Sequence, residues 1–256
     1  MEDSNKIGRS DNLPTHVHYL LHWAQKSPNR EFLIQPLPTG EVIKFTWQQV
    51  ADEVKRMAAY LQAMNLPKRS QIAIFGKNSA HWIMADLAIW MSGHISVPLY
   101  TTLNADGTKY VLEHSESKVL FIGKLDGVGD SWNEVKGIIP NDMPCIRLPL
   151  APDYDAITWD DIVAKTQPTA SPYLPQAQEL ATIIYTSGST GLPKGVMQSY
   201  ETLLSPAAEL KGTFGVTSDD RALSYLPLAH VAERVFIQSS VMICGFTVYF
   251  ANSLET

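Results

Sequence analysis

Short apolar runs alternate with helical patterns through the first two-thirds of the chain, and this alternation restricts the folds that the chain can adopt. The apolar runs 32–35 and 41–45 flank a Pro-Thr-Gly turn and predict a β-hairpin. Thr46 and Gln49 then give a capping-box pattern, and apolar residues recur after them at helical spacing. Strand, helix and strand in this order indicate a parallel or mixed sheet covered by helices.

The same order of elements continues up to residue 122. The predicted elements are strands at 71–75, 96–100 and 118–122 and helices at 80–92 and 107–114. Asn78 or Ser79 can cap the first of these helices, and Gly93 supplies its C-terminal stop. We therefore predict an α/β fold with mixed, mostly parallel sheets flanked by helices.

Prolines mark a boundary in the middle of the chain. Seven of the 16 prolines lie between residues 140 and 175, where they break regular structure and stiffen the connection. The prediction is a first α/β subdomain at 1–140, a Pro-rich connection at 141–178 and the start of a second α/β subdomain at 179–256. The second subdomain is predicted to contain strands at 181–186, 195–198, 221–225 and 246–250 and helices from about 201 and at 231–244. Because the chain ends soon after the last strand, we expect a truncated sheet that leaves the apolar side chains of 246–250 exposed.

The bulk composition argues against several classes of protein. The formal net charge is -6 at pH 7, and without a basic excess no nucleic-acid partner is expected. An anionic ligand would therefore be held locally, by backbone N–H groups and a few cations. No apolar core of a signal peptide is seen, and polar residues interrupt the most apolar stretch, 235–251, so no transmembrane segment is predicted. The expectation is a cytoplasmic protein.

The residues with the clearest chemistry lie between two of the predicted strands. Residues 185–195 read Tyr-Thr-Ser-Gly-Ser-Thr-Gly-Leu-Pro-Lys-Gly and bring four small hydroxyls, three glycines and one lysine together. Glycines let backbone N–H groups converge on an anion, hydroxyls add donors, and Lys194 supplies a point charge for phosphate. The segment therefore predicts a polyphosphate site.

Two other motifs do not fit this loop. A Walker A loop requires Gly-x4-Gly-Lys-Ser/Thr before a helix, but Pro193 and Gly195 occupy the second glycine position and the hydroxyl position. A nucleophile elbow requires Gly-x-Ser-x-Gly, whereas Gly188 and Gly191 are separated by two residues. A flexible, hydroxyl-rich hairpin loop without a ligand remains the alternative.

The whole segment resembles the phosphate loop of the adenylate-forming superfamily, which contains acyl-CoA synthetases, firefly luciferases and peptide-synthetase adenylation domains. The resemblance implies that the loop closes over the β- and γ-phosphates of ATP. It implies ATP contacts at Thr186, Ser187, Gly188, Ser189, Thr190, Gly191, Lys194 and Gly195. It further implies that Thr186 helps to hold Mg²⁺ and that Lys194 contacts the pyrophosphate end of the nucleotide.

A second stretch, 225–234, reads Tyr-Leu-Pro-Leu-Ala-His-Val-Ala-Glu-Arg and resembles the next motif of this superfamily in its long-chain fatty acyl form. The resemblance implies that His230 lies at the junction of the acyl pocket and the adenylate. A histidine packed at a helix N-terminus is the alternative. Residues 97–100 and 110–115 also resemble family stretches, so the resemblance extends from about residue 32 to the last residue.

The reaction that the resemblance implies is ATP-dependent activation of a carboxylic acid, with a long-chain fatty acid favoured, through an acyl adenylate to acyl-CoA. ATP, Mg²⁺ and CoA would be used. The superfamily's C-terminal catalytic lysine, its Tyr-Gly-x-Thr-Glu segment and its ribose-binding Asp are not found in these 256 residues. We therefore expect an incomplete large N-terminal domain, without the small C-terminal domain and inactive by itself. A non-catalytic remnant with a partial ATP site, an aryl-CoA ligase and an amino-acid adenylation enzyme remain alternatives, and peripheral membrane association stays open.

Overall fold

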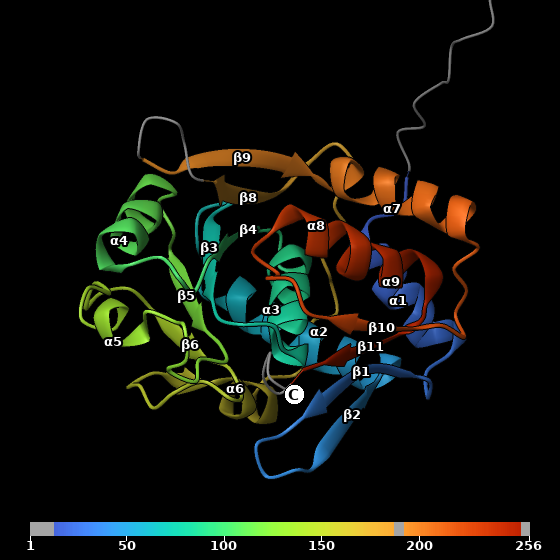
Figure 1. The fold of residues 1–256 in the computed structure, drawn as a ribbon, viewed down its shortest axis with the longest axis horizontal. Coiled ribbons are helices and arrows are strands. Elements are labelled where there is room, and N and C mark those ends of the chain that lie inside the picture. Colours follow the sequence, from blue (N-terminus) through green and yellow to red (C-terminus); the bar gives the residue numbers. More distant parts are fainter. Residues whose placement is uncertain (1–12, 187–191, 252–256) are drawn as a thin grey trace, which may run out of the picture.

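The structure is a computed structural model that describes residues 13–186 and 192–251. In this part of the chain the strands form two sheets, and helices lie around and between them (Figure 1). The larger sheet contains β3 (Gln71–Phe75), β4 (Ile95–Leu99), β5 (Val119–Ile122), β6 (Cys145–Arg147), β7 (Ile157–Thr158), β8 (Leu180–Thr186) and β9 (Lys194–Ser199). The smaller sheet contains β1 (Glu31–Pro36), β2 (Val42–Thr46), β10 (Arg221–Ser224) and β11 (Thr247–Phe250).

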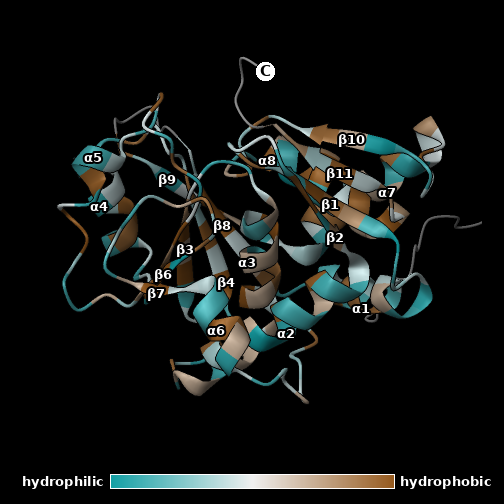
Figure 2. Cartoon of the chain, turned by 90° about the horizontal axis from the view of Figure 1, so that it is seen from below, coloured by the Kyte–Doolittle hydropathy of each residue, from teal (hydrophilic) through white to brown (hydrophobic). Residues whose placement is uncertain are grey.

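The helices cover both faces of the larger sheet and one side of the smaller one (Figures 1 and 2). They are α1 (His16–Lys26), α2 (Trp47–Ala63), α3 (Ala80–Met91), α4 (Ala105–His114), α5 (Trp132–Val135), α6 (Trp159–Lys165), α7 (Tyr200–Phe214), α8 (Val231–Glu233), the π-helix η1 (Arg234–Ser239) and α9 (Ser240–Cys244). None of the helices that the structure describes is long and apolar enough to span a bilayer.

The larger sheet has the strand order β7-β6-β5-β3-β4-β8-β9. Neighbouring strands are parallel except β8 and β9, which form an antiparallel hairpin. Successive side chains of a strand point to opposite faces, so Ile72 and Ile74 join the core with α2 and α3. Ala73 and Phe75 join a second core with α4 and α5. The predicted α/β fold with mixed, mostly parallel sheets flanked by helices is confirmed.

Helix α3 is the central helix of the molecule. All 12 of its residues are buried, because it packs against α2 and against strands of both sheets. A helix that is apolar on every side is expected in the interior of a protein rather than on its surface. Asp86 is the acidic residue of this helix, and its burial requires a partner, which the second motif supplies as described below.

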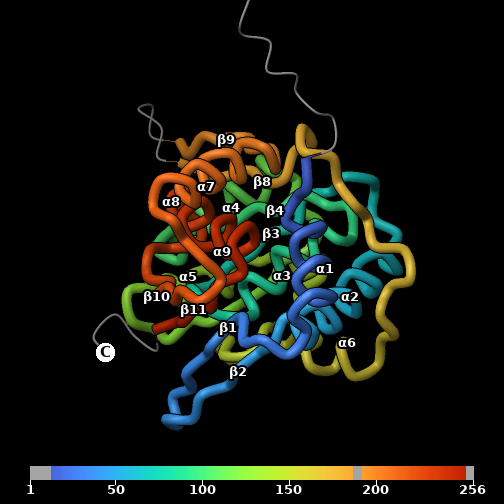
Figure 3. Tube along the Cα trace, turned by 90° about the vertical axis from the view of Figure 1, so that its right-hand side faces the viewer, coloured from blue at the N-terminus to red at the C-terminus, as the bar shows by residue number. Residues whose placement is uncertain are grey.

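The smaller sheet joins the two ends of the described chain. Its order is β10-β11-β1-β2, and β1 pairs with β11 in parallel, with Leu33 opposite Val248. Figure 3 shows the early elements α1 and β1 beside the late elements α9 and β11. The prediction that the side chains of residues 246–250 are exposed was wrong. Phe246, Val248 and Phe250 are 3%, 0% and 3% exposed, because β10 and β1 flank β11 and helices cover its face.

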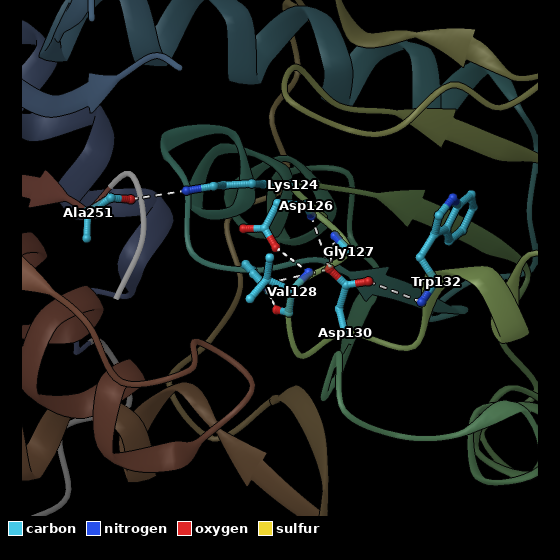
Figure 4. A network of polar contacts seen from close by, with 8 residues as sticks. Lys124, Asp126, Gly127, Val128, Asp130, Trp132 and Ala251 are labelled. Carbon is cyan, nitrogen blue, oxygen red and sulfur yellow. Dashed lines mark hydrogen bonds and ion pairs between the residues drawn. The ribbon is translucent and has the colours of Figure 1, made fainter. Parts of the chain in front are cut away.

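A lysine contact links the two sheets at the carboxyl end of β11. Lys124, just after β5, donates from Nζ to the carbonyl oxygen of Ala251 at 3.1 Å (Figure 4). The loop after Lys124 is folded around Asp130, whose carboxylate accepts the backbone N–H groups of Gly127 at 2.9 Å and Trp132 at 3.2 Å. Burial lowers the pKa of Lys124. The end of the smaller sheet is therefore held by a loop of the larger one.

Local patterns placed most elements correctly. The hairpin β1–β2 is present, and Thr46 and Gln49 form the predicted reciprocal capping box of α2. Ser79, rather than Asn78, caps α3 by accepting the backbone N–H of Trp82 at 3.2 Å. The predicted helix 231–244 is present, but its middle is the π-helix η1.

The Pro-rich connection has more regular structure than its composition indicates. Within 141–178 the chain forms β6, β7 and α6, and the two short strands extend the larger sheet. Thr158 caps α6 by accepting the backbone N–H of Asp161 at 3.1 Å. Both sheets contain strands from the two predicted subdomains, so the division of the chain at 141–178 stays a proposal about folding units.

Candidate functional site

The hairpin β8–β9 carries the predicted phosphate loop. Thr186 and Lys194 face each other in the last pair of the hairpin, next to the connecting loop, and both are exposed. Gly195 follows in β9, opposite Tyr185. Ser187, Gly188, Ser189, Thr190 and Gly191 lie outside the described residues, so their predicted contacts with ATP stay predictions.

Gly195 has a packing reason to be glycine. A Cβ at this position would lie 2.8 Å from Cγ2 of Ile183 and 3.2 Å from Cζ of Tyr185. Both side chains belong to β8, the strand across the hairpin. The close approach lets the Tyr185 ring lie beside β9, which places it in the wall of the neighbouring cavity.

A cavity of about 680 Å³ opens beside the phosphate-loop end of the hairpin. Figure 1 shows α4 next to this end of β8 and β9. The cavity is lined by Tyr100, Thr102, Leu103, Asn104, Asp106, Gly107, Tyr110, Tyr185, Thr186, Leu192, Pro193 and His230. It brings Thr186 and His230, from the two predicted motifs, to one place, whereas Lys194 is not among its lining residues.

Aromatic side chains form one wall of the cavity. Tyr185 Oη lies 2.8 Å from Nδ1 of His114, and the Tyr110 ring stacks on His114 with centroids 5.3 Å apart. Burial raises the pKa of Tyr100 and of Tyr185, so both phenols keep their protons at neutral pH. These two phenols therefore add no charge to the cavity, which is also lined by Asp106. Sequence reasoning assigned no role to these residues, although 97–100 and 110–115 were already singled out as family-like stretches.

His230 is the N-cap residue of α8. Its Nδ1 accepts the backbone N–H of Ala232 at 3.1 Å, and its own N–H donates to the carbonyl oxygen of Pro227 at 2.8 Å. With Nδ1 occupied as an acceptor, the neutral ring carries its proton on Nε2. His230 therefore has the cap contact of the packing alternative and also lines the cavity, and none of the described residues hydrogen-bonds its Nε2.

A buried ion pair fixes the end of the second motif. Arg234 Nη2 lies 3.0 Å and 3.2 Å from the two carboxylate oxygens of Asp86 in α3, and both side chains are fully buried. Gln238 donates to the same carboxylate at 2.6 Å, and the guanidinium lies over the rings of Trp82 and Trp90. Removing one partner of such a pair leaves an uncompensated buried charge, which costs about 3–5 kcal/mol. The start of η1 is thus locked onto the central helix.

The oxygen donors of the site fit Mg²⁺ when phosphates are present. Mg²⁺ prefers oxygen ligands and is commonly bound by one or two protein oxygens together with substrate phosphates and water. Thr186 offers a hydroxyl at the cavity, beside the phosphate loop. Among the residues that the structure describes, no group of three His, Cys, Asp or Glu side chains could hold a metal by itself.

Curated proteins of similar sequence include fatty acyl-CoA synthetases. Fatty acyl-CoA synthetase A of Dictyostelium discoideum is 28% identical over 96% of this chain, which spans 39% of that protein. Long chain acyl-CoA synthetase 4 of Arabidopsis thaliana is 30% identical over 87% of this chain, which spans 37% of that protein. The chain therefore corresponds to less than half the length of these relatives.

Solved structures show the same fold. An anthranilate CoA ligase solved with anthranoyl-AMP aligns with a TM-score of 0.79 at 19% identity, over 94% of this chain and 46% of the other. A protein from Rhodopseudomonas palustris described as a putative long-chain-fatty-acid CoA ligase aligns with a TM-score of 0.77 at 22% identity, over 93% of this chain and 57% of the other. The family model described as AMP-binding enzyme matches residues 20–256, and the chain belongs to this family.

Proposed function

We propose that the protein carrying this chain activates a carboxylic acid with ATP and transfers the acyl group to CoA, and that the acid is a long-chain fatty acid. The observation that carries the proposal is the cavity that unites Thr186, at the phosphate loop, with His230 of the second motif. Family membership supports the reaction, and the names of the relatives support the choice of acid. Because the chain spans 37–39% of those relatives, the activity is proposed for the whole protein.

In the proposed first step, a carboxylate oxygen of the acid attacks the α-phosphate of ATP. An O–P bond forms, the bond from the α-phosphorus to the bridging oxygen breaks, and pyrophosphate leaves. The step joins two anions, so positioning and charge neutralisation lower its barrier most. Lys194 would contact the departing pyrophosphate, and the Thr186 hydroxyl would hold Mg²⁺. When bound, this ion would withdraw charge from the phosphate oxygens.

In the proposed second step, the CoA thiolate attacks the acyl carbon and the acyl–phosphate bond breaks, which releases AMP. The described chain contributes the wall in which the acyl adenylate would lie. His230 Nε2 would donate a hydrogen bond at the junction of acyl group and phosphate. The neutral Tyr100 and Tyr185 phenols add no charge to the wall, which suits an apolar acyl group.

The test is acid-dependent exchange of pyrophosphate into ATP by the full-length protein in the presence of Mg²⁺. The acids are a series from acetate to palmitate, together with benzoate and amino acids. We expect exchange to require an acid and to be fastest with the long chains. If exchange is fastest with benzoate or an amino acid, the proposal of a long-chain fatty acid as substrate is wrong. If a folded full-length protein shows no exchange with any acid, the non-catalytic alternative is favoured.

A further inference from the structure

Glu233 lies three residues after His230, and the proposed reaction does not use it. Its side chain is 1% exposed, and a buried carboxylate is costly unless hydrogen bonds compensate for the lost water. Ser224 Oγ, at the end of β10, donates to Glu233 Oε1 at 2.7 Å. Burial raises the pKa of Glu233, and Ser224 together with the nearby backbone N–H groups of Tyr225 and Leu226 opposes this rise by favouring the carboxylate. The Glu233 carboxylate thus lies beside hydrogen-bond donors of residues 224–226, where the segment that leads to His230 begins.

Asn78 extends this arrangement to the larger sheet. Its Nδ2 donates to Ser224 Oγ at 2.9 Å and to the carbonyl oxygen of Leu226 at 2.6 Å. Its Oδ1 accepts the backbone N–H of Leu228 at 2.8 Å. The hydrogen bonds therefore run in one direction, from the Asn78 amide through the Ser224 hydroxyl to the Glu233 carboxylate. Asn78 itself precedes the Ser79 cap of the central helix α3.

We name residues 225–230 the His230 loop. Apolar packing alone does not fix its first half, because Tyr225 and Leu226 are 58% and 36% exposed. Asn78 instead holds the backbone of Leu226 and Leu228, and Ser224 connects Asn78 to Glu233. The backbone N–H of His230 donates a hydrogen bond to the carbonyl oxygen of Pro227, so the position of His230 depends on the position of this first half.

We propose that Glu233, bridged by Ser224 to Asn78, is a positioning residue that fixes the His230 loop and thereby sets the place of His230 in the cavity. Glu233 would touch no reacting atom. The inference rests on the proposed role of His230, so its test includes a measurement that does not depend on turnover.

The first measurement is amide hydrogen exchange of the full-length protein with Glu233→Gln. The carboxamide keeps the shape but presents an NH₂ group where a carboxylate oxygen accepts donors, so the loop loses part of its hold. We expect the amides of Tyr225, Leu226 and Leu228 to exchange about tenfold faster, the effect of losing about 1.4 kcal/mol of local stability. Glu209→Gln, on the exposed side of α7, is the matched control and should change none of them. Unchanged exchange of the loop amides in Glu233→Gln overturns the proposal, whether or not the protein is an acyl-CoA ligase.

The second measurement separates positioning from a general loss of stability. In the assay of acid-dependent pyrophosphate exchange into ATP, Glu233→Gln should raise the KM for the acid about tenfold. A small displacement of a side chain in a binding site has effects of this size or larger. The KM for ATP should stay within about twofold. Ser224→Ala removes the bridging hydroxyl but keeps the Glu233 carboxylate, and it should likewise raise the KM for the acid without changing the KM for ATP. Ser205→Ala, on the surface of α7, is its control.

A double-mutant cycle with His230→Ala decides whether Glu233 acts through His230. If it does, Glu233→Gln should have no further effect on the KM for the acid once His230 is alanine, because coupled residues are non-additive. Fully additive effects would contradict the proposal even if both single variants are impaired. Inactivity of the wild type with every acid would remove the proposed function, while the exchange of the loop amides would still decide the positioning role.

Discussion

Lys194 stands opposite Thr186 where the phosphate loop leaves the β8–β9 hairpin, and its side chain is exposed. Among the described residues the Lys194 side chain has no hydrogen-bond or ion-pair partner, so its ammonium group can contact a phosphate without breaking a contact with them. We predict that Lys194→Ala slows acid-dependent pyrophosphate exchange on the order of 10–1000-fold, the range for losing one contact to developing charge. Lys68→Ala, at an exposed lysine before β3, should leave the rate unchanged. Equal rates in the two variants would remove the pyrophosphate role of Lys194.

His16 is buried beside the second motif, and its burial makes the stability of the protein depend on pH. Its ring is buried against Trp90, with centroids 4.6 Å apart, and its Nε2 lies 2.9 Å from Ser239 Oγ of η1. Burial, with a smaller contribution from Arg234, lowers the pKa of His16 to about 3. The unfolded chain takes up a proton at about pH 6.5, whereas the folded chain does not until about pH 3. Stability is therefore highest above pH 6.5 and is lost as the pH falls through this window.

The test is urea unfolding at several pH values between 7 and 4.5. One such histidine lowers the free energy of unfolding by up to about 1.4 kcal/mol for each pH unit below about 6. We expect His16→Gln to reduce the slope against pH, without abolishing it, because burial also lowers the pKa of His81 to about 4. His22→Gln, at an exposed position of α1, should keep the slope of the wild type. Identical slopes for all three proteins would contradict the assignment.

At the scale of elements, the β8–β9 hairpin depends on its glycine. A methyl group at residue 195 would meet Ile183 at 2.8 Å and press on the Tyr185 ring. We predict that Gly195→Ala destabilises the protein by about 1–3 kcal/mol, the usual cost of overpacking, and shifts the NMR resonances of Tyr185 and its partner His114. In Gly212→Ala the new methyl group meets nothing within 4 Å in α7, so a gain of about 0.5–1 kcal/mol is expected there. A loss in both variants would point to backbone effects instead of the contact with β8.

The elements that the sequence predicts well are those with their own periodicity and caps. The strand 71–75 was placed without error, and helix α2 has both its apolar face and its capping box in local sequence. By contrast, β6 has three residues and β7 two, too few to show an alternation, and neighbouring prolines argued against any strand there. The π-helix η1 was hidden because its residues are as apolar as those of an α-helix, and its start is fixed by Asp86 of a distant helix.

The candidate site was predictable only where one segment holds the chemistry. Thr186 and Lys194 belong to a single hairpin, and a long local motif identifies them. The aromatic wall combines residues after β4, in α4 and in β8. Their proximity arises from the strand order of the larger sheet, in which β4 lies beside β8 although about 80 residues separate them in sequence. No local pattern records that pairing.

At the scale of the whole molecule, the two sheets share one hydrophobic core. This core contains Leu33 of β1 and Val248 of β11, and also Ile72 of β3 in the larger sheet. The central helix α3 packs between the sheets, and Lys124 ties the end of β11 to the loop after β5. A molecule built in this way is expected to unfold as one unit, since opening the smaller sheet uncovers apolar side chains of the larger one.

Leu33→Ala tests this unity. Leu33 is fully buried in β1 opposite Val248, and removing its side chain should lower the free energy of unfolding by about 2–5 kcal/mol. Because the core is shared, amide exchange should accelerate in β3 of the larger sheet by the same factor as in β11 of the smaller one. Val42→Ala, at a half-exposed position of the edge strand β2, should accelerate neither strand appreciably. Faster exchange in β11 with unchanged exchange in β3 would mean that the two sheets open separately.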